Sequence, residues 1–196
     1  MRHSLKSKRR LDEFEAKRRQ LLQLETLQEQ GFLQLYYYDE SGFSLTSALP
    51  YAWQKKGQTI EVPAARGRRI NVAGLLNKQG DFHYQTHTGQ IGSKEIICLL
   101  DSFCQGMEQK TVVVVDNAPT HRSKAFMEKV KCWQEQDLYV LFLPPYSPEL
   151  NRIEMLWKKM KYQWLDFKAY LSWHSLQQHL EQVLLDIGKE YIINLV

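Results

Sequence analysis

Residues 141–161, LFLPPYSPELNRIEMLWKKMK, combine local patterns that predict a strand, a turn and a helix in close succession. An apolar run typical of a buried strand comes first, and three prolines then mark a turn. The helix is expected to start near Ser147 or Asn151, because either side chain can cap it. Its first turn carries a carboxylate, Glu154. The residues of its buried stripe, at helical spacing, are Ile153, Leu156, Trp157 and Met160.

Two further carboxylates stand at the ends of predicted strands. Residues 32–40 alternate with the two-residue period of a strand that closes near Asp39. The valines at residues 112–115 are typical of a strand covered on both faces, and Asp116 follows them directly. Ligands of open sheets bind at the carboxyl ends of the strands, so parallel neighbours would place both side chains in one crevice. A helix returning from the last strand would bring Glu154 to the same place.

The rest of the chain predicts a mixed sheet. Ser41-Gly42 is expected to break the first strand, and an antiparallel meander should follow at residues 43–49, 70–76 and 82–88. Helices then alternate with buried strands, which favours parallel pairing through crossovers. The pattern is that of an α+β or α/β protein. The later elements are expected as helices at residues 93–103, capped by Ser93, at 121–136 and at 175–188, and a last strand at 138–143.

Residues 1–30 predict a basic helical lead-in or linker ahead of one domain at residues 31–196. Residues 2–19 hold eight basic and three acidic side chains, and leucines at helical spacing follow. A solvated linker and a contact with a DNA backbone both fit this composition. The segment is too short for a three-helix module that reads DNA.

Composition narrows the possible partners and compartment. The 26 Lys and Arg side chains exceed the 22 Asp and Glu, so the net charge of +4 permits a polyanionic partner without requiring one. Cys98, Cys104 and Cys132 show neither zinc nor CxxC spacing, which favours a reduced, cytoplasmic setting. No stretch approaches the ~18 apolar residues that span a bilayer, so no membrane partner is expected.

The three acids predict a chemistry. Oxygen ligands without His or Cys suit Mg²⁺ or Mn²⁺ rather than zinc, and two such ions support in-line displacement at phosphorus. Local roles compete with this interpretation, because a strand-end Asp often serves a turn and the helix dipole favours a first-turn Glu. Among the other acids, Glu40 is expected on the opposite strand face, Asp81 in a turn and Asp101 within a helix.

Three motifs occur in order along the chain: YYYDESGF at residues 36–43, VVVVDNAPTHRS at 112–123 and LPPYSPELNRIEMLWKKMK at 143–161. With AWQKKGQ and RRINVAGLLN, they closely resemble the DDE transposases of the mariner-like superfamily, in particular the bacterial insertion-sequence six-thirty family. The chain departs from the family in two ways. Between Asp116 and Glu154 lie 37 residues, three more than is usual, which we place around 131–137. Arg152 replaces a common proline, which should loosen the helix start and add a cation near the nucleic acid.

The resemblance implies an α/β, ribonuclease H-like fold, in which a mixed five-stranded sheet is flanked by helices. It implies that Asp39, Asp116 and Glu154 are the catalytic acids and hold Mg²⁺ or Mn²⁺, with two ions expected. The implied function is cleavage of DNA at transposon ends and transfer of the 3′-hydroxyl end to a TA target, by a homodimer on DNA. Since the chain begins close to the catalytic fold, an upstream helix-turn-helix polypeptide is expected to recognise the ends. The alternatives are a non-catalytic DNA-binding remnant and a ribonuclease H-like nuclease without strand transfer.

Basic side chains on the loops and in the last motif are candidates for DNA contacts, although such loops are commonly just solvated. His121 is expected either to approach a phosphate or to start a helix with a satisfied hydrogen bond. Asn117 is expected to bond the turn beside Asp116. The candidates are Lys55, Lys56, Arg66, Arg68, Arg69, His121, Arg152 and Lys158.

Overall fold

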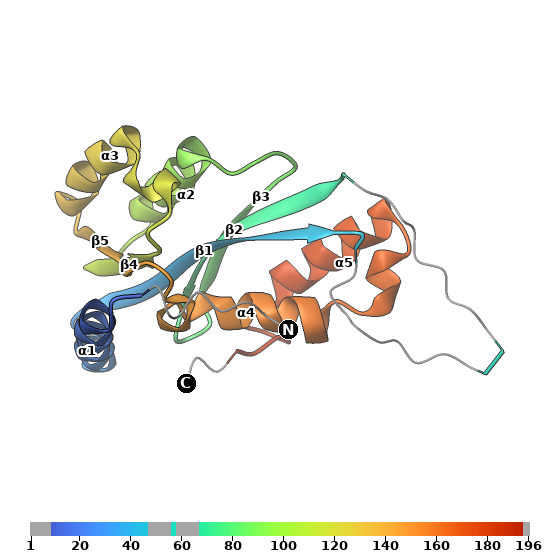
Figure 1. Ribbon diagram of the computed structural model, residues 1–196, viewed down its shortest axis with the longest axis horizontal. Helices are drawn as coiled ribbons and strands as arrows, with labels where there is room; N and C mark the ends of the chain where they lie inside the picture. Colours follow the sequence, from blue (N-terminus) through green and yellow to red (C-terminus); the bar gives the residue numbers. More distant parts are fainter. Residues whose placement is uncertain (1–8, 47–55, 58–66, 194–196) are drawn as a thin grey trace.

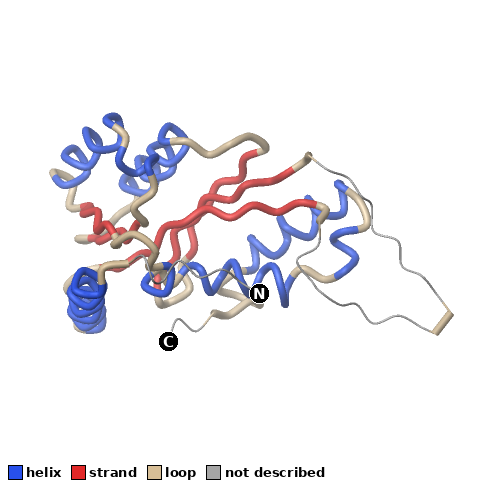
Figure 2. Tube along the Cα trace, in the orientation of Figure 1, coloured by secondary structure: helices blue, strands red, loops and turns tan. Residues whose placement is uncertain are grey.

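A mixed five-stranded sheet with helices on both faces forms the protein (Figures 1 and 2). The computed structural model describes residues 9–46, 56–57 and 67–193. The strand order is β3-β2-β1-β4-β5, which confirms the predicted sheet. The strands are β1 (Gln34–Ser44), β2 (Arg69–Asn77), β3 (Phe82–His87), β4 (Thr111–Val115) and β5 (Leu138–Phe142).

Five α-helices and several short helical turns are described. None of the helices in the described part of the chain is long and apolar enough to cross a membrane. The α-helices are α1 (Leu11–Glu29), α2 (Ser93–Gln105), α3 (Lys124–Gln134), α4 (Ile153–Lys159) and α5 (Trp173–Asp186). The 3-10 turns are Pro119–Arg122, Pro148–Leu150 and Phe167–Tyr170, and a π-helical turn, Met160–Trp164, continues α4.

The central strand, β1, is longer than its sequence suggests. It pairs antiparallel with β2 through to Ser44↔Arg69, so the predicted break at Ser41-Gly42 is wrong, and Ser44 still belongs to β1. One antiparallel partner suffices to carry the strand through the glycine. The parallel ladder with β4, in contrast, covers only Gln34 to Tyr37. Asp39 therefore lies in the middle of β1, two residues past the end of that ladder, and not at the end of a strand.

Two apolar layers cover the two faces of the sheet. Leu35 and Tyr37 of β1 pack in the layer of α1, α4 and α5, whereas Tyr36 and Tyr38 pack in the layer of α2 and α3. Figure 1 shows α2 and α3 on one side of the sheet and α4 and α5 on the other. The two-residue period predicted for β1 thus decides which layer each side chain enters.

The second half of the chain follows the predicted alternation of helix and strand, since β4 pairs in parallel with both β1 and β5. β5 is mostly half-buried at the sheet edge, and not fully buried as predicted. Gly92 rather than Ser93 is the cap position of α2, because the helical backbone already includes Ser93. The Ser93 hydroxyl donates to the Thr120 carbonyl.

Neither expected residue caps the helix that carries Glu154. The 3-10 turn Pro148–Leu150 follows Ser147, and α4 begins only at Ile153. The Asn151 side chain is used elsewhere: its Nδ2 donates to the Tyr38 carbonyl of β1 over 2.9 Å. The start of α4 is therefore fixed by contacts with distant elements and not by a local cap.

Candidate active site

The three predicted acids line one cavity of about 410 Å³. Asp39 comes from β1, Asp116 directly follows β4, and Glu154 lies in the first turn of α4. The early end of the β4 ladder opens the sheet at this point, so side chains from both strands and from α4 can meet. The structure thus brings together the three residues singled out from the sequence.

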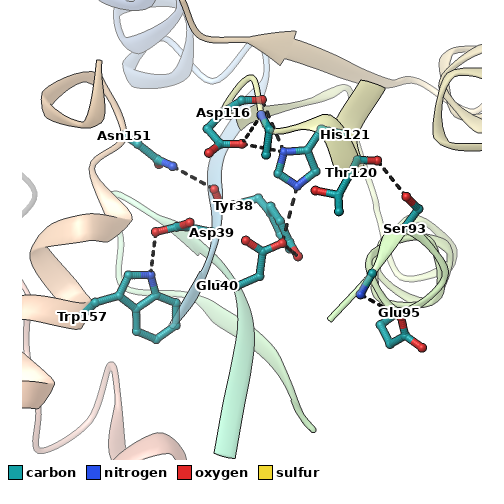
Figure 3. Close-up of polar contacts among 12 residues, drawn as sticks. Tyr38, Asp39, Glu40, Ser93, Glu95, Asp116, Thr120, His121, Asn151 and Trp157 are labelled. Carbon is teal, nitrogen blue, oxygen red and sulfur yellow. Dashed lines mark hydrogen bonds and ion pairs between the residues drawn. The ribbon is translucent and has the colours of Figure 1, made fainter. Parts of the chain in front are cut away.

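A tryptophan of α4 holds Asp39. Trp157 Nε1 donates to Asp39 Oδ2 over 3.1 Å (Figure 3). Gly74, the register partner of Asp39 on β2, leaves room for the indole. A Cβ at Gly74 would lie 3.0 Å from Trp157 Cη2 and 2.7 Å from Phe82 Cε2. A missing side chain on β2 therefore allows the close approach that orients Asp39.

A buried histidine holds Asp116. His121 Nδ1 donates to Asp116 Oδ1 over 2.7 Å, and the Ala118 backbone N–H donates to the same oxygen. The other ring nitrogen lies 3.5 Å from Glu40 Oε1 (Figure 3). Burial alone would lower the pKa of His121, but the hydrogen bonds and charges of Asp116 and Glu40 raise it to about 9. Burial would raise the pKa of Asp116, and the bonds from His121 and Ala118 instead lower it overall.

The cavity concentrates negative charge. Burial raises the pKa of Asp39 well above its ordinary value, and the charges of Glu154, Glu40 and Asp116 add to the shift. Partial burial raises the pKa of Glu154 as well, opposed by the Lys161 ammonium and supported by Asp116. Carboxylates that repel one another in this way gain from a cation between them.

The donor set suits a hard divalent cation, because every candidate ligand is a carboxylate oxygen. Among the described residues, no three His, Cys, Asp or Glu side chains lie close enough to share one ion in this conformation. Asp116 Oδ1 is bonded instead to His121 and Ala118. The residues fit such an ion chemically.

The predicted DNA contacts fall into different settings. Lys55 and Arg66 lie outside the described residues. Lys56, Arg68, Arg69 and Lys158 are exposed. Lys158 also borders a second, larger cavity of about 930 Å³, which shares Glu154 with the first.

Two residues that were predicted to contact DNA instead bond to other side chains of the protein. His121 is only 1% exposed, so the structure favours a satisfied hydrogen bond over an approach to phosphate. Arg152, expected as a cation near the nucleic acid, pairs with Glu25 of α1 at 2.6 Å. Asn117 Oδ1 accepts from Arg122 Nε over 2.6 Å, and Arg122 ends the 3-10 turn that follows Asp116.

Sequence reasoning misses two side chains that support the acids. It assigns Trp157 to the buried stripe and Asn151 to a helix cap. Trp157 is indeed buried, yet its indole N–H reaches Asp39, and the buried Asn151 amide reaches the Tyr38 carbonyl. Buried polar groups need partners, so a Trp and an Asn beside a predicted acid carry a usable signal.

Sheet order and flanking helices define a ribonuclease H-like fold. Solved structures with this fold include the Mos1 transposase paired-end complex with the left transposon end, at TM-score 0.60 and 17% identity, covering 87% of this chain and 53% of that chain. The Mos1 strand transfer complex matches at TM-score 0.59 and 15% identity, covering 86% and 53%. A simian T-cell lymphotropic virus intasome matches at TM-score 0.54 and 12% identity, covering 82% and 50%. These likenesses establish the fold, and the chain spans about half the length of the Mos1 chains.

The family follows from the sequence itself. The model of the family described as DDE superfamily endonuclease matches residues 34–177, which is more than half of the chain. The chain therefore belongs to the DDE superfamily endonucleases, and the predicted resemblance is confirmed. A comparison with curated proteins finds no match.

Proposed function

We propose that this chain is the catalytic domain of a transposase, which cleaves DNA at transposon ends and transfers the 3′-hydroxyl end to target DNA. One observation carries the proposal: Asp39, Asp116 and Glu154 line a single cavity within the segment that matches the DDE endonuclease family. Structures described as Mos1 paired-end and strand transfer complexes share the fold, which supports DNA as the partner.

Asp39, Asp116 and Glu154 would hold the ions, for which we propose two Mg²⁺ or Mn²⁺. When bound, such ions activate the attacking oxygen and stabilise the leaving oxygen of an in-line displacement at phosphorus. Mos1 complexes described with Mg and with Mn share the fold and support this choice.

The protein's own residues prepare the carboxylates for this task. Trp157 fixes one oxygen of Asp39, and His121 fixes one oxygen of Asp116. Bonds of this kind from outer residues orient ligands and strengthen their hold on a metal. Burial raises the pKa of Glu154 overall, and the cationic Lys161 opposes that rise and so favours the charged form.

The proposed assembly goes beyond this chain. We propose a homodimer that brings two transposon ends together, with helix-turn-helix modules from an upstream polypeptide reading the ends and a TA dinucleotide as the target. A cytoplasmic setting belongs to the same proposal. Its support is the family match together with a Mos1 structure described as a paired-end complex.

Cleavage and strand transfer on labelled element-end DNA test the proposal. Wild-type protein should cut and join in Mg²⁺ or Mn²⁺, and Asp116→Ala and Glu154→Ala should each lose at least about a hundredfold in rate. Glu128→Ala, an exposed carboxylate on α3, is the matched control and should react like wild type. Equal activity of all four proteins would eliminate the acid triad. Cutting without joining would favour a ribonuclease H-like nuclease that lacks strand transfer. DNA binding without cutting would favour a non-catalytic DNA-binding remnant.

A further inference from the structure

The segment that delivers Glu154 is tied to α1, far away in sequence. Arg152 Nε donates to Glu25 Oε1 and Arg152 Nη2 to Glu25 Oε2, each over 2.8 Å. The Tyr37 hydroxyl of β1 donates to the same carboxylate over 3.0 Å. One carboxylate of α1 thus joins the start of α4 to the central strand.

This ion pair is sheltered from solvent. The side chains of Arg152 and Glu25 are 21% and 13% exposed, and the guanidinium engages both carboxylate oxygens. Exposed single-point pairs contribute little to a fold, whereas a sheltered, bidentate pair also fixes orientation. The pair can therefore hold the backbone at Arg152 in one position.

The start of α4 depends on such distant contacts. Arg152 occupies the cap position of α4 without a side-chain cap bond. The preceding Asn151 bonds the Tyr38 carbonyl, and its own carbonyl accepts from the Glu154 backbone N–H. Residues 151 and 152, which directly precede Ile153 and Glu154, are thus anchored to β1 and α1.

We propose that Glu25 and Arg152 are positioning residues, which hold the first turn of α4 so that Glu154 reaches the site formed with Asp39 and Asp116. This inference rests on the proposed function of those acids. Under it, α1 supports the site through Glu25 and is not only a linker. Beside the pair, α1 and α4 border the cavity of about 930 Å³ that also contains Glu154, so loss of the pair leaves α4 room to shift.

Metal affinity and local amide exchange of the full chain, without DNA, test the proposal. Glu25→Gln is isosteric and removes the charge, Arg152→Met removes the guanidinium, and Arg152→Lys keeps the charge but not the bidentate geometry. We expect Glu25→Gln and Arg152→Met to lower Mn²⁺ affinity, followed by electron paramagnetic resonance, by about tenfold. Amide exchange at residues 153–156 should accelerate in both, and Arg152→Lys should fall in between.

Glu29→Gln is the matched control, because it breaks another ion pair of α1, to Lys78 at 2.7 Å in the β2–β3 turn. It should keep wild-type Mn²⁺ affinity and exchange. Wild-type values for Glu25→Gln and Arg152→Met would overturn the proposal, as would an equal loss in Glu29→Gln. If Arg152→Met does not fold, the milder Glu25→Gln decides. A wild-type protein that never cleaves DNA would count against the proposed function, while this DNA-free comparison would still stand.

Discussion

Trp157 shows how one side chain serves both packing and chemistry. Its ring lies in the apolar layer with Phe43 and Phe82, and its N–H reaches out of that layer to Asp39. The same residue therefore links the stability of the core to the orientation of an acid.

Replacing Trp157 by Phe should separate the two roles. Phenylalanine keeps an aromatic ring but leaves Asp39 Oδ2 without its donor, so we expect Mn²⁺ affinity and DNA cleavage to fall by about tenfold. Titration with Mn²⁺ and single-turnover cleavage measure the two effects. Trp164→Phe, in the π-helical turn beside Tyr191, is the control and should change neither quantity. Unchanged affinity in Trp157→Phe would remove the tryptophan from the site.

Among the elements, β2 shapes the site through a residue that has no side chain. Gly74 faces Asp39 in the register, and the space above it is occupied by Trp157 and Phe82. Glycine is needed here because the rings of Trp157 and Phe82 approach the β2 backbone so closely that they leave no room for a Cβ. The absence of a side chain at this position of β2 thereby determines how closely α4 packs on the sheet.

Gly74→Ala should destabilise the fold and disturb Asp39 together. The new methyl group must displace Phe82 or Trp157, and overpacking of this kind costs about 1–3 kcal/mol. Urea denaturation measures the loss in free energy of unfolding. Gly89→Ala is the matched control, since a Cβ there meets nothing within 4 Å. Equal stabilities of the two variants would show that the rings yield without cost.

At the scale of the whole molecule, α1 packs against the domain that contains the sheet. Leu21 of α1 belongs to the same apolar layer as α4 and α5, and Gln28, about two turns further along the helix, is also buried. Glu25 adds the ion pair to Arg152. Residues 1–30, predicted as a lead-in or linker, thus include a helix that packs on the core, and we propose that it unfolds with the domain.

Neighbouring leucines of α1 test this cooperativity. Leu21 is 4% exposed and Leu22 is 51% exposed. Leu21→Ala should lower the free energy of unfolding by about 2–4 kcal/mol, because a buried side chain leaves a cavity. Leu22→Ala should change it by less than about 0.5 kcal/mol. Urea transitions followed by circular dichroism and by tryptophan fluorescence should coincide. A separate early transition, or equal effects of the two substitutions, would show that α1 is an independent linker.

Local pattern in the sequence was enough to predict a mixed sheet and most helices, and it singled out the three acids as candidates. The five strands of the sheet were expected only from the family resemblance. Alternation in residues 32–40 and the valines at 112–115 reflect which faces are buried, and burial acts on residues close together in the chain. The exact course of β1 was not predictable, because Ser41-Gly42 has the composition of a turn. Only the ladder with β2 carries the strand through it.

The long-range contacts that hold Asp39 and the start of α4 were decided by the tertiary structure alone. Trp157 and Asp39 are 118 residues apart, Arg152 and Glu25 are 127, and Asn151 and Tyr38 are 113. Such contacts depend on how the helices pack on the two faces of the sheet. The spacing of apolar residues along the chain does not determine that packing. His121 illustrates the difference. Its sequence context admits both a phosphate contact and a structural bond, and burial between Asp116 and Glu40 decides for the second.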